Sequence, residues 1–175
     1  AHTPYGGRPG PEIVELTRAG CERLFGKGAS LVILACNTAS AIALRQLQHD
    51  WLPGYRKALG RPVNVLGIIV PTIEAATGLP WQHEAERRGE AIEKLDLLGI
   101  FCTPATAASR VCEIEIDKRR EDVAVFCEPC PELAGLIEKG AGAVELAIVV
   151  ERHVEALRAR LGDYQSLLDD REHAS

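Results

Sequence analysis

The sequence predicts an α/β protein with a parallel sheet, and two patterns support this prediction. Short apolar runs rich in β-branched residues alternate four times with segments whose apolar residues recur at helical spacing. This alternation is typical of βα units, in which parallel strands are joined by right-handed crossovers. In addition, the run LVILA at 31–35 is apolar at every position, which is typical of a strand in a parallel sheet covered on both faces.

Six segments are expected in the first half of the chain. Proline favours a first helical turn and glycine a helix end, whereas a cluster of both indicates a loop. In chain order we expect a helix from Pro11 to Gly26, a strand over 31–35, a helix from about Thr38 to His49, a loop over 50–62, a strand over 63–69 ending at Pro71, and a short helix over 72–77.

The second half is expected to begin with a polar surface insertion and to continue with two further βα units. In chain order we expect the insertion over 78–89, a strand over 96–101, a helix from about 105 to 118, a strand over 122–126, a short helix over 133–139 and a long amphipathic helix over 144–161. Beyond Gly162 the tail is acidic, and we expect it to fray.

Composition excludes several classes of function. A net charge of −5 argues against a nucleic-acid partner, because phosphate binding needs clustered Lys and Arg. No apolar stretch approaches the roughly 18 residues that cross a bilayer, so we expect no membrane partner. The start, AHTPYGGRPG, lacks the charged-then-apolar order of a secretory signal, which favours a cytoplasmic protein. In that compartment the six cysteines are expected to be free thiols.

The ends of the predicted strands are where a ligand is expected, because open parallel sheets bind ligands beyond the carboxyl ends of their strands. Two of these ends, CNT at 36–38 and TPAT at 103–106, are rich in small hydrogen-bonding groups. Cys36 stands where a strand gives way to a helix, and free N–H groups and the helix dipole favour a thiolate or a bound carboxylate there. The alternative is that Cys36 is a small buried apolar residue, which is the usual role of a free cysteine.

A metal or redox interpretation rests on the pair Cys127 and Cys130. One C-x-x-C without a second pair is weak evidence, because structural zinc needs four ligands. His49, His83, His153 and His173 have no spacing typical of metal ligands, and each is interpreted as a surface or helix-face residue. No metal is therefore expected.

Several strings resemble, in the same order, the motifs of one enzyme family. ACNTASAIAL resembles the first catalytic motif of the cofactor-independent glutamate racemases, within the aspartate/glutamate racemase superfamily, and CNTAS is specific in this context. Four weaker strings agree with it, namely TPYGGRPGPEIVELT, GIIVPTIEAAT, GIFCTPATAAS and CPELAGLIEKG. The resemblance covers roughly residues 1 to 140.

The resemblance implies a fold of two similar Rossmann-like domains facing a cleft. The first, incomplete domain would cover 1–95 and carry the CNTAS motif, a partial second domain would cover 96–162, and 163–175 would form a tail. The family interconverts L- and D-glutamate for peptidoglycan synthesis without a cofactor. Glutamate is therefore the expected substrate and a homodimer the expected assembly.

The resemblance also implies roles for individual residues. In the family two cysteines lie on opposite faces of Cα, one removing the proton as thiolate while the other returns one as thiol. Cys36 would be one of these acid/base thiols, and Glu138 would support a histidine. The residues expected to bind the substrate are Tyr5, Gly6, Asn37, Thr38 and Thr106, with Thr103 as a weaker candidate.

The sequence also departs from the family pattern. The Asp-Ser-Gly strand expected before residue 1 and the Gly-Cys-Thr-His segment expected after the last helix are not found, so the chain holds one of the two thiols. None of Cys21, Cys102, Cys112, Cys127 or Cys130 is expected to replace the second. Three alternatives stay open, namely an aspartate racemase, a hydantoin racemase, and an inactive fragment or protein that only binds its ligand.

Overall fold

The computed structural model describes residues 5–78, 96–120 and 122–173, without the side chains of residues 96 and 165–173. Nearly all of the insertion predicted over 78–89, and the predicted domain boundary near 95, lie outside these residues. The division into two domains therefore stays a prediction.

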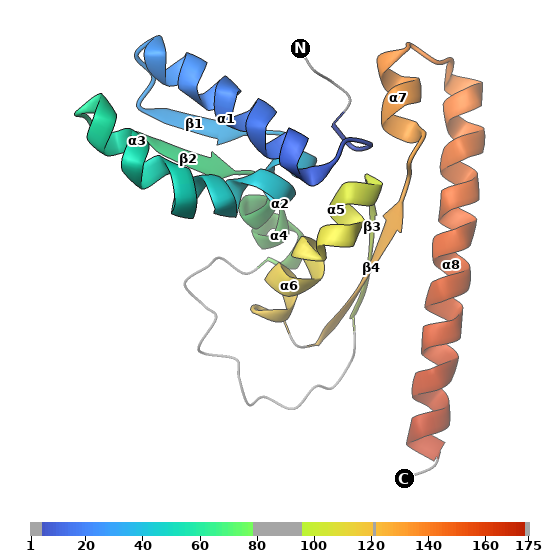
Figure 1. The fold of residues 1–175 in the computed structure, drawn as a ribbon. Helices are drawn as coiled ribbons and strands as arrows, with labels where there is room; N and C mark the ends of the chain where they lie inside the picture. The colour runs from blue at the N-terminus through green and yellow to red at the C-terminus, as the bar shows by residue number, and fades with distance from the viewer. Residues whose placement is uncertain (1–4, 79–95, 121, 174–175) are drawn as a thin grey trace.

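Two parallel two-stranded sheets form the centre of the molecule (Figure 1). In the first, β1 (Leu31–Leu34) pairs with β2 (Asn64–Gly67). In the second, β3 (Asp96–Cys102) pairs with β4 (Val123–Pro129). The predicted α/β class and parallel pairing are confirmed.

The first sheet is covered by helices on one face. Helices α1 (Gly10–Gly26), α2 (Asn37–Gln46) and α3 (Leu52–Leu59) share a buried core with alternate strand residues. The core residues include Val14, Phe25, Val32, Leu34, Ala43, Leu47, Leu52 and Val65. Gly67 lets β2 approach α2, because a Cβ at this position would lie 2.7 Å from a methyl group of Leu44.

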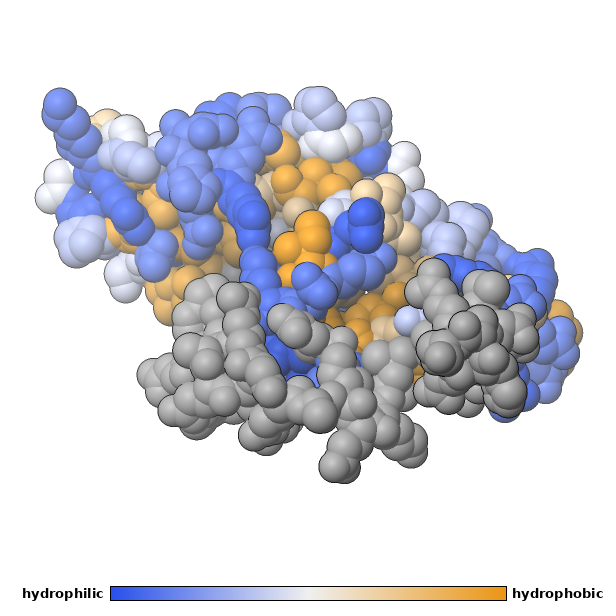
Figure 2. Space-filling model, turned by 90° about the horizontal axis from the view of Figure 1, so that it is seen from below, coloured by the Kyte–Doolittle hydropathy of each residue, from blue (hydrophilic) through white to orange (hydrophobic). Residues whose placement is uncertain are grey.

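The opposite face of this sheet is open among the described residues. Leu31, Ile33 and Leu66 are 46%, 60% and 44% exposed. Within residues 5–78, 96–120 and 122–173, this strand is therefore covered on one face and not, as predicted, on both. The run LVIL alternates between exposed and buried, and Figure 2 shows that apolar side chains reach the surface of the molecule elsewhere too.

The second sheet is covered on both faces. On one face α4 (Ile69–Thr77) and α6 (Val111–Asp117) form a core with β4, made of Ile69, Ile73, Cys112, Ile116 and Cys127. On the other face lies α8 (Ala143–His173), where the Phe126 and Tyr164 rings meet edge to face at 5.2 Å. Gly99 has no side chain where the Leu157 side chain packs on β3. Helices α5 (Pro104–Ser109) and α7 (Leu133–Glu138) complete this half.

The predicted loop over 50–62 is wrong. A π-helical turn, η1 (Leu47–Trp51), continues α2, and α3 follows it directly. Pro53 lies in the first turn of α3, and Gly60 ends that helix in a left-handed conformation with φ of 69°. The residues interpreted as loop formers thus begin and end a helix. Trp51 and Tyr55 are held by aromatic packing on Phe25.

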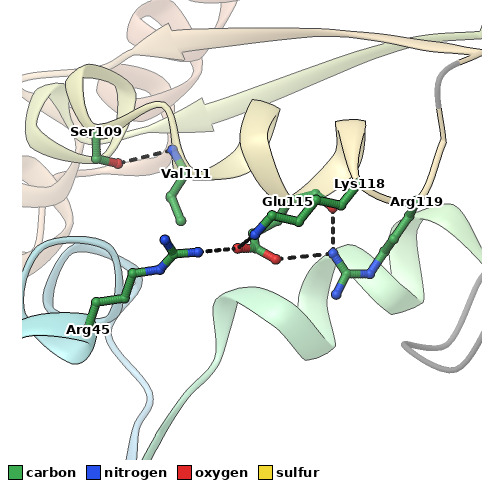
Figure 3. A network of polar contacts seen from close by, with 6 residues as sticks. All are labelled: Arg45, Ser109, Val111, Glu115, Lys118 and Arg119. Atoms are coloured by element: carbon green, nitrogen blue, oxygen red, sulfur yellow. Dashed lines mark hydrogen bonds and ion pairs between the residues drawn. The ribbon is translucent and has the colours of Figure 1, made fainter. Parts of the chain in front are cut away.

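The single helix predicted over 105–118 is broken at Arg110, whose φ is 53°. The Ser109 hydroxyl donates to the carbonyl of Thr106 and accepts from the N–H of Val111, so it connects the last residue of α5 to the first residue of α6. Serine often ends a helix in this way, because its side chain competes for backbone hydrogen bonds. Figure 3 shows the Ser109 contact with Val111.

Two boundaries also differ from prediction. Helix α4 begins at Ile69, and β2 ends at Gly67, so Pro71 lies in a first helical turn rather than at a strand end. Helix α8 continues to His173, so the prediction that the tail beyond Gly162 frays is wrong. In the described part of the chain, no helix is both long enough and apolar enough to cross a membrane.

A polar network joins the two halves of the molecule. Glu115 of α6 is buried and contacts Arg45 of α2 at 3.1 Å, Lys118 at 2.7 Å and Arg119 at 3.2 Å (Figure 3). Burial alone would raise the pKa of Glu115, but hydrogen bonds from Lys118 and Arg119 lower it. This carboxylate therefore links α2 to the core of the second half.

Candidate active site

The predicted hinge after β1 has the expected geometry. Cys36 is the N-cap residue of α2, with extended backbone angles of φ −85° and ψ 120°, and it is exposed. Its carbonyl accepts the first helical hydrogen bond, from the N–H of Ser40 at 2.9 Å. Among the described residues no side-chain hydrogen bond caps α2, so the first N–H groups of this helix have no side-chain acceptor and are candidates for binding a ligand. The buried-cysteine alternative is therefore wrong for Cys36.

Ser40 connects the three segments that meet at the hinge. Its hydroxyl donates to the carbonyl of Leu34 at 2.9 Å and accepts from the N–H of Ile68 at 3.3 Å. One buried side chain thereby ties the start of α2 to the ends of β1 and β2. Within CNTAS the serine is a structural residue, whereas the cysteine and asparagine are exposed.

The two predicted strand ends meet through three threonines. The Oγ1 atom of Thr103 lies 2.9 Å from that of Thr38 and 3.0 Å from that of Thr106. The Thr106 hydroxyl is also 3.4 Å from Thr38. Thr103 additionally caps α5 by accepting from the N–H of Thr106 at 3.3 Å. Thr103, the weaker candidate, is thus the residue that joins the other two.

A cavity of about 230 Å³ opens beside this cluster. It is lined by Asn37, Thr38, Phe101, Cys102, Thr103, Thr106, Cys130, Leu133, Ala134 and Ile137. Of the predicted site residues, the structure brings Asn37, Thr38, Thr103 and Thr106 to this cavity. Cys36 precedes the lining residue Asn37 in the sequence but is not itself among the residues that line the cavity.

The remaining predicted residues lie further from the cavity lining. Gly6 packs against Thr103, because a Cβ there would lie 2.7 Å from the threonine methyl group. Tyr5 precedes it and is half-buried. Glu138 is the exposed last residue of α7. Its predicted support of a histidine is not tested by these contacts.

Sequence reasoning missed part of the cavity wall. Cys102 and Cys130 line the cavity, although neither is among the residues predicted to bind the substrate. The signal was available, because both follow or end parallel strands of one sheet and must therefore reach the same edge. The apolar wall from α7 had no comparable signal, since Leu133 and Ile137 are ordinary helix residues.

His153, predicted to be a surface or helix-face residue, lies on the face of α8 that packs against β4. It is buried, with Nδ1 2.8 Å from Glu128 Oε1 and Nε2 3.5 Å from Glu132 Oε2. Arg160 contacts the other oxygen of Glu128 at 3.2 Å. These contacts hold α8 against the end of β4 and the start of α7. Within the described residues, no three or more His, Cys, Asp or Glu side chains are arranged so that they could hold a metal ion, and the Cys127–Cys130 pair is buried.

The chain is similar to bacterial glutamate racemases over most of its length. It is 79% identical over 164 residues to a glutamate racemase of Caulobacter sp. strain K31, covering 94% of this chain and 58% of the relative. A glutamate racemase of Phenylobacterium zucineum is 72% identical over 162 residues, covering 93% of this chain and 57% of the relative. The chain thus spans somewhat more than half the length of these relatives. No protein-family model matches it.

Solved structures of glutamate racemases are also similar to this chain. Glutamate racemase isoform RacE1 of Bacillus anthracis has a TM-score of 0.61 and 26% identity, covering 91% of this chain and 50% of that one. The Francisella tularensis glutamate racemase, solved in complex with D-glutamate, has a TM-score of 0.61 and 22% identity, covering 86% of this chain and 48% of that one. The resemblance to glutamate racemases and the racemase fold, both predicted from the sequence, are confirmed.

Proposed function

We propose that this chain carries one half of the catalytic site of a glutamate racemase, with Cys36 as one of its two acid/base thiols. The observation that carries the proposal is the exposed Cys36 at the uncapped start of α2, next to a cavity lined by Asn37 and three threonines. The high identity to glutamate racemases supports glutamate as the substrate.

The chemistry requires a base on one side of Cα and hydrogen-bond donors for the carboxylates. The Cα–H group next to a carboxylate is a weak acid, so removal of its proton needs a positioned base and stabilisation of the negative charge that develops on Cα and the carboxylate. Cys36 as thiolate would supply the base. The first-turn N–H groups of α2 and the amide of Asn37 would donate to carboxylate oxygens.

The threonine cluster would orient these groups. Thr38 belongs to α2, whereas Thr103 and Thr106 belong to the start of α5. Their hydroxyl contacts would therefore fix the distance between the starts of these two helices. Gly6 packs on Thr103 and would bring Tyr5 to the same edge. Glu138 would support a histidine outside this chain, as the family resemblance implies.

A test of this proposal separates proton removal from inversion. The longer protein that contains this chain is incubated with L- or D-glutamate in D₂O, and α-proton exchange is followed by NMR while optical rotation reports inversion. Cys36→Ser should lower inversion in both directions by about 10³-fold or more, because general acid–base groups contribute roughly 10² to 10⁴ each. Circular dichroism of the variant, unchanged from that of the parent, serves as the folding control.

Substrate choice and completeness are tested in the same assay. Faster turnover of aspartate or of a hydantoin than of glutamate would assign the chain to one of the two alternative racemases. Full inversion by the 175-residue chain alone would contradict the proposal that it holds half of the site. Binding of glutamate without exchange in the longer protein would instead support a protein that only binds.

The wider role follows from the proposed reaction. The protein would act in the cytoplasm as a homodimer and supply D-glutamate for peptidoglycan. Depletion of the protein should make growth depend on added D-glutamate, and sedimentation should give a dimer mass. Growth unaffected by depletion would contradict the proposed role in cell-wall synthesis.

A further inference from the structure

Two cysteines besides Cys36 are close to the proposed substrate. Cys102 ends β3, is half-buried and lines the cavity, and Cys130 lines it as well but is only 4% exposed. The N–H of Cys130 donates to the carbonyl of Cys102 at 2.8 Å, which fixes both backbones at the cavity floor. Of the two, Cys102 is the thiol that a molecule in the cavity can reach.

A second thiol lies behind Cys102. In the β3–β4 register Cys102 is opposite Pro129 and Ile100 is opposite Cys127, so the side chains of Cys102 and Cys127 lie on the same face of the sheet. Cys127 and Cys112 belong to the core cluster on that face, and Cys102 packs against it. Three sulfur atoms thus gather between the sheet and α6.

This arrangement favours a thiolate at Cys102. A hydrogen bond from the Cys127 side chain lowers the pKa of Cys102. The same contact raises the pKa of Cys127 to about 12, and burial raises that of Cys21 to about 11. The pKa values of Cys112 and Cys130 are raised as well, for Cys112 chiefly by its hydrogen bond with Cys127 and for Cys130 by burial. Because the thiolate is the nucleophile, Cys102 differs in reactivity from these four thiols.

The cavity wall indicates which reagents can approach Cys102. None of the described residues that line it is charged, and Phe101, Leu133 and Ile137 form an apolar side. On the other side Asn37 offers amide donors to a carbonyl oxygen. Besides the substrate proposed above, this cavity can therefore admit a small uncharged molecule with an apolar end and a carbonyl group.

We propose that Cys102 is a covalent modification site, taking small uncharged α,β-unsaturated carbonyl compounds that enter through the cavity. The Cys102 thiolate sulfur attacks the terminal carbon of the C=C bond. An S–C bond forms, the C=C π bond breaks, and its electron pair takes a proton from water at the carbon next to the carbonyl. The thiol proton has passed to solvent, no group leaves, and nothing is oxidised or reduced.

The proposal does not depend on racemase activity, because the adduct itself is measured. The 175-residue chain in a Cys36→Ser background is treated with acrylamide at neutral pH under native conditions, and labelling of each cysteine is followed by peptide mass spectrometry. Cys102 should be labelled at least about ten-fold faster than Cys21 or Cys112, since both are buried and protonated.

Two variants test why Cys102 is expected to react faster than the other thiols. Cys127→Ala removes the hydrogen-bond donor and should slow labelling of Cys102 about three-fold or more at neutral pH, with the difference shrinking in alkaline solution, where Cys102 ionises in both proteins. Ala134→Leu narrows the cavity and should slow labelling of Cys102. Cys21→Ala, in the other core, is the matched control and should leave it unchanged.

Labelling of Cys102 no faster than that of Cys21 and Cys112 would overturn the proposal. The proposal would also be overturned if Cys102 were labelled at the same rate in the parent and in Cys127→Ala at neutral pH, provided both proteins give the same circular dichroism spectrum. These outcomes leave the role proposed for Cys36 untouched, since that role is judged by exchange and inversion.

Discussion

The two sheets of this protein have the same strand pairing but differ in helix capping and in how their faces are packed. Each has two parallel strands, and a helix begins directly after the end of its first strand. After β3 the helix start is capped by the Thr103 hydroxyl, whereas after β1 no described side chain caps α2. The second sheet is packed on both faces and the first on one. The comparison shows that the same joint can complete a helix or leave its N–H groups free for a ligand.

The cores differ as well. The first half is held by an aromatic cluster, in which the Trp51 and Tyr55 rings lie 4.7 Å apart and both pack on the fully buried Phe25. The second half has aliphatic side chains and thiols instead. The predictions below are ordered by the size of the expected effect on the free energy of unfolding.

Phe25→Ala should have the largest effect. It removes the ring on which two other rings pack, and filling the resulting cavity would require α1 to move toward β1. We expect a loss of about 3–5 kcal/mol in the free energy of unfolding, measured by urea titration followed by tryptophan fluorescence. Leu24→Ala is the control, since Leu24 is exposed on the same helix. Similar losses in both variants would contradict an aromatic core centred on Phe25.

Glu115→Gln should come next, because it breaks the network between the two halves. The substitution removes the negative charge from a buried ion pair with Arg119, and we expect a loss of about 3 kcal/mol near neutral pH. Because the folded-state pKa of Glu115 is lowered, its contribution is present above the unfolded pKa of about 4.3 and is lost as pH falls through the folded value.

The difference in stability between the parent and Glu115→Gln should therefore shrink as the pH falls below the unfolded pKa of about 4.3 and disappear below the lower folded pKa, as urea titrations at several pH values would show. Arg45→Gln is the control, because Arg45 is 71% exposed and its pair should contribute no more than about 1 kcal/mol. A difference between parent and Glu115→Gln that stays constant with pH would argue against a charged Glu115.

Thr103→Ala should have a smaller effect and tests the capping contrast directly. Loss of the hydroxyl uncaps α5 and is expected to cost about 1 kcal/mol. Cys36→Ala, at the equivalent joint of the first half, should change stability by less than about 0.5 kcal/mol, because the exposed thiol makes no capping bond. Equal losses would show that the two joints do not differ in this respect.

The smallest effect is expected on the open face of the first sheet. Ile33→Thr should change the free energy of unfolding by less than about 0.5 kcal/mol, since Ile33 is 60% exposed. Val32→Ala, one residue away on the covered face, should cost about 2 kcal/mol. Ile33→Thr should also reduce concentration-dependent association in sedimentation, because it makes an exposed apolar face more polar. A large loss of stability from Ile33→Thr would show that this face is covered in solution.

The candidate site was partly predictable because its most specific signal is local. Cys36, Asn37 and Thr38 follow a β-branched apolar run and precede an alanine-rich helix, so their placement at a helix start depends on neighbours in sequence alone. The rule that ligands bind beyond the carboxyl ends of parallel strands selected both strand ends as candidates. The contact of Thr38 with Thr103 and Thr106 joins two separate sheets, so only the tertiary structure decided it. The apolar wall from α7 did not follow, because no local pattern tells which face of a short helix meets a cavity.

The sequence by itself determined the βα alternation, the parallel pairing and the hinge at Cys36, because these arise from residue periodicity and from interactions within a few positions. Only the tertiary structure decided that Pro53 and Gly60 bound a helix, that Glu128 draws His153 into a buried contact, and that one face of β1 is open. Each of these depends on which distant segment packs against the residue, and the free energy of that packing outweighs local preference.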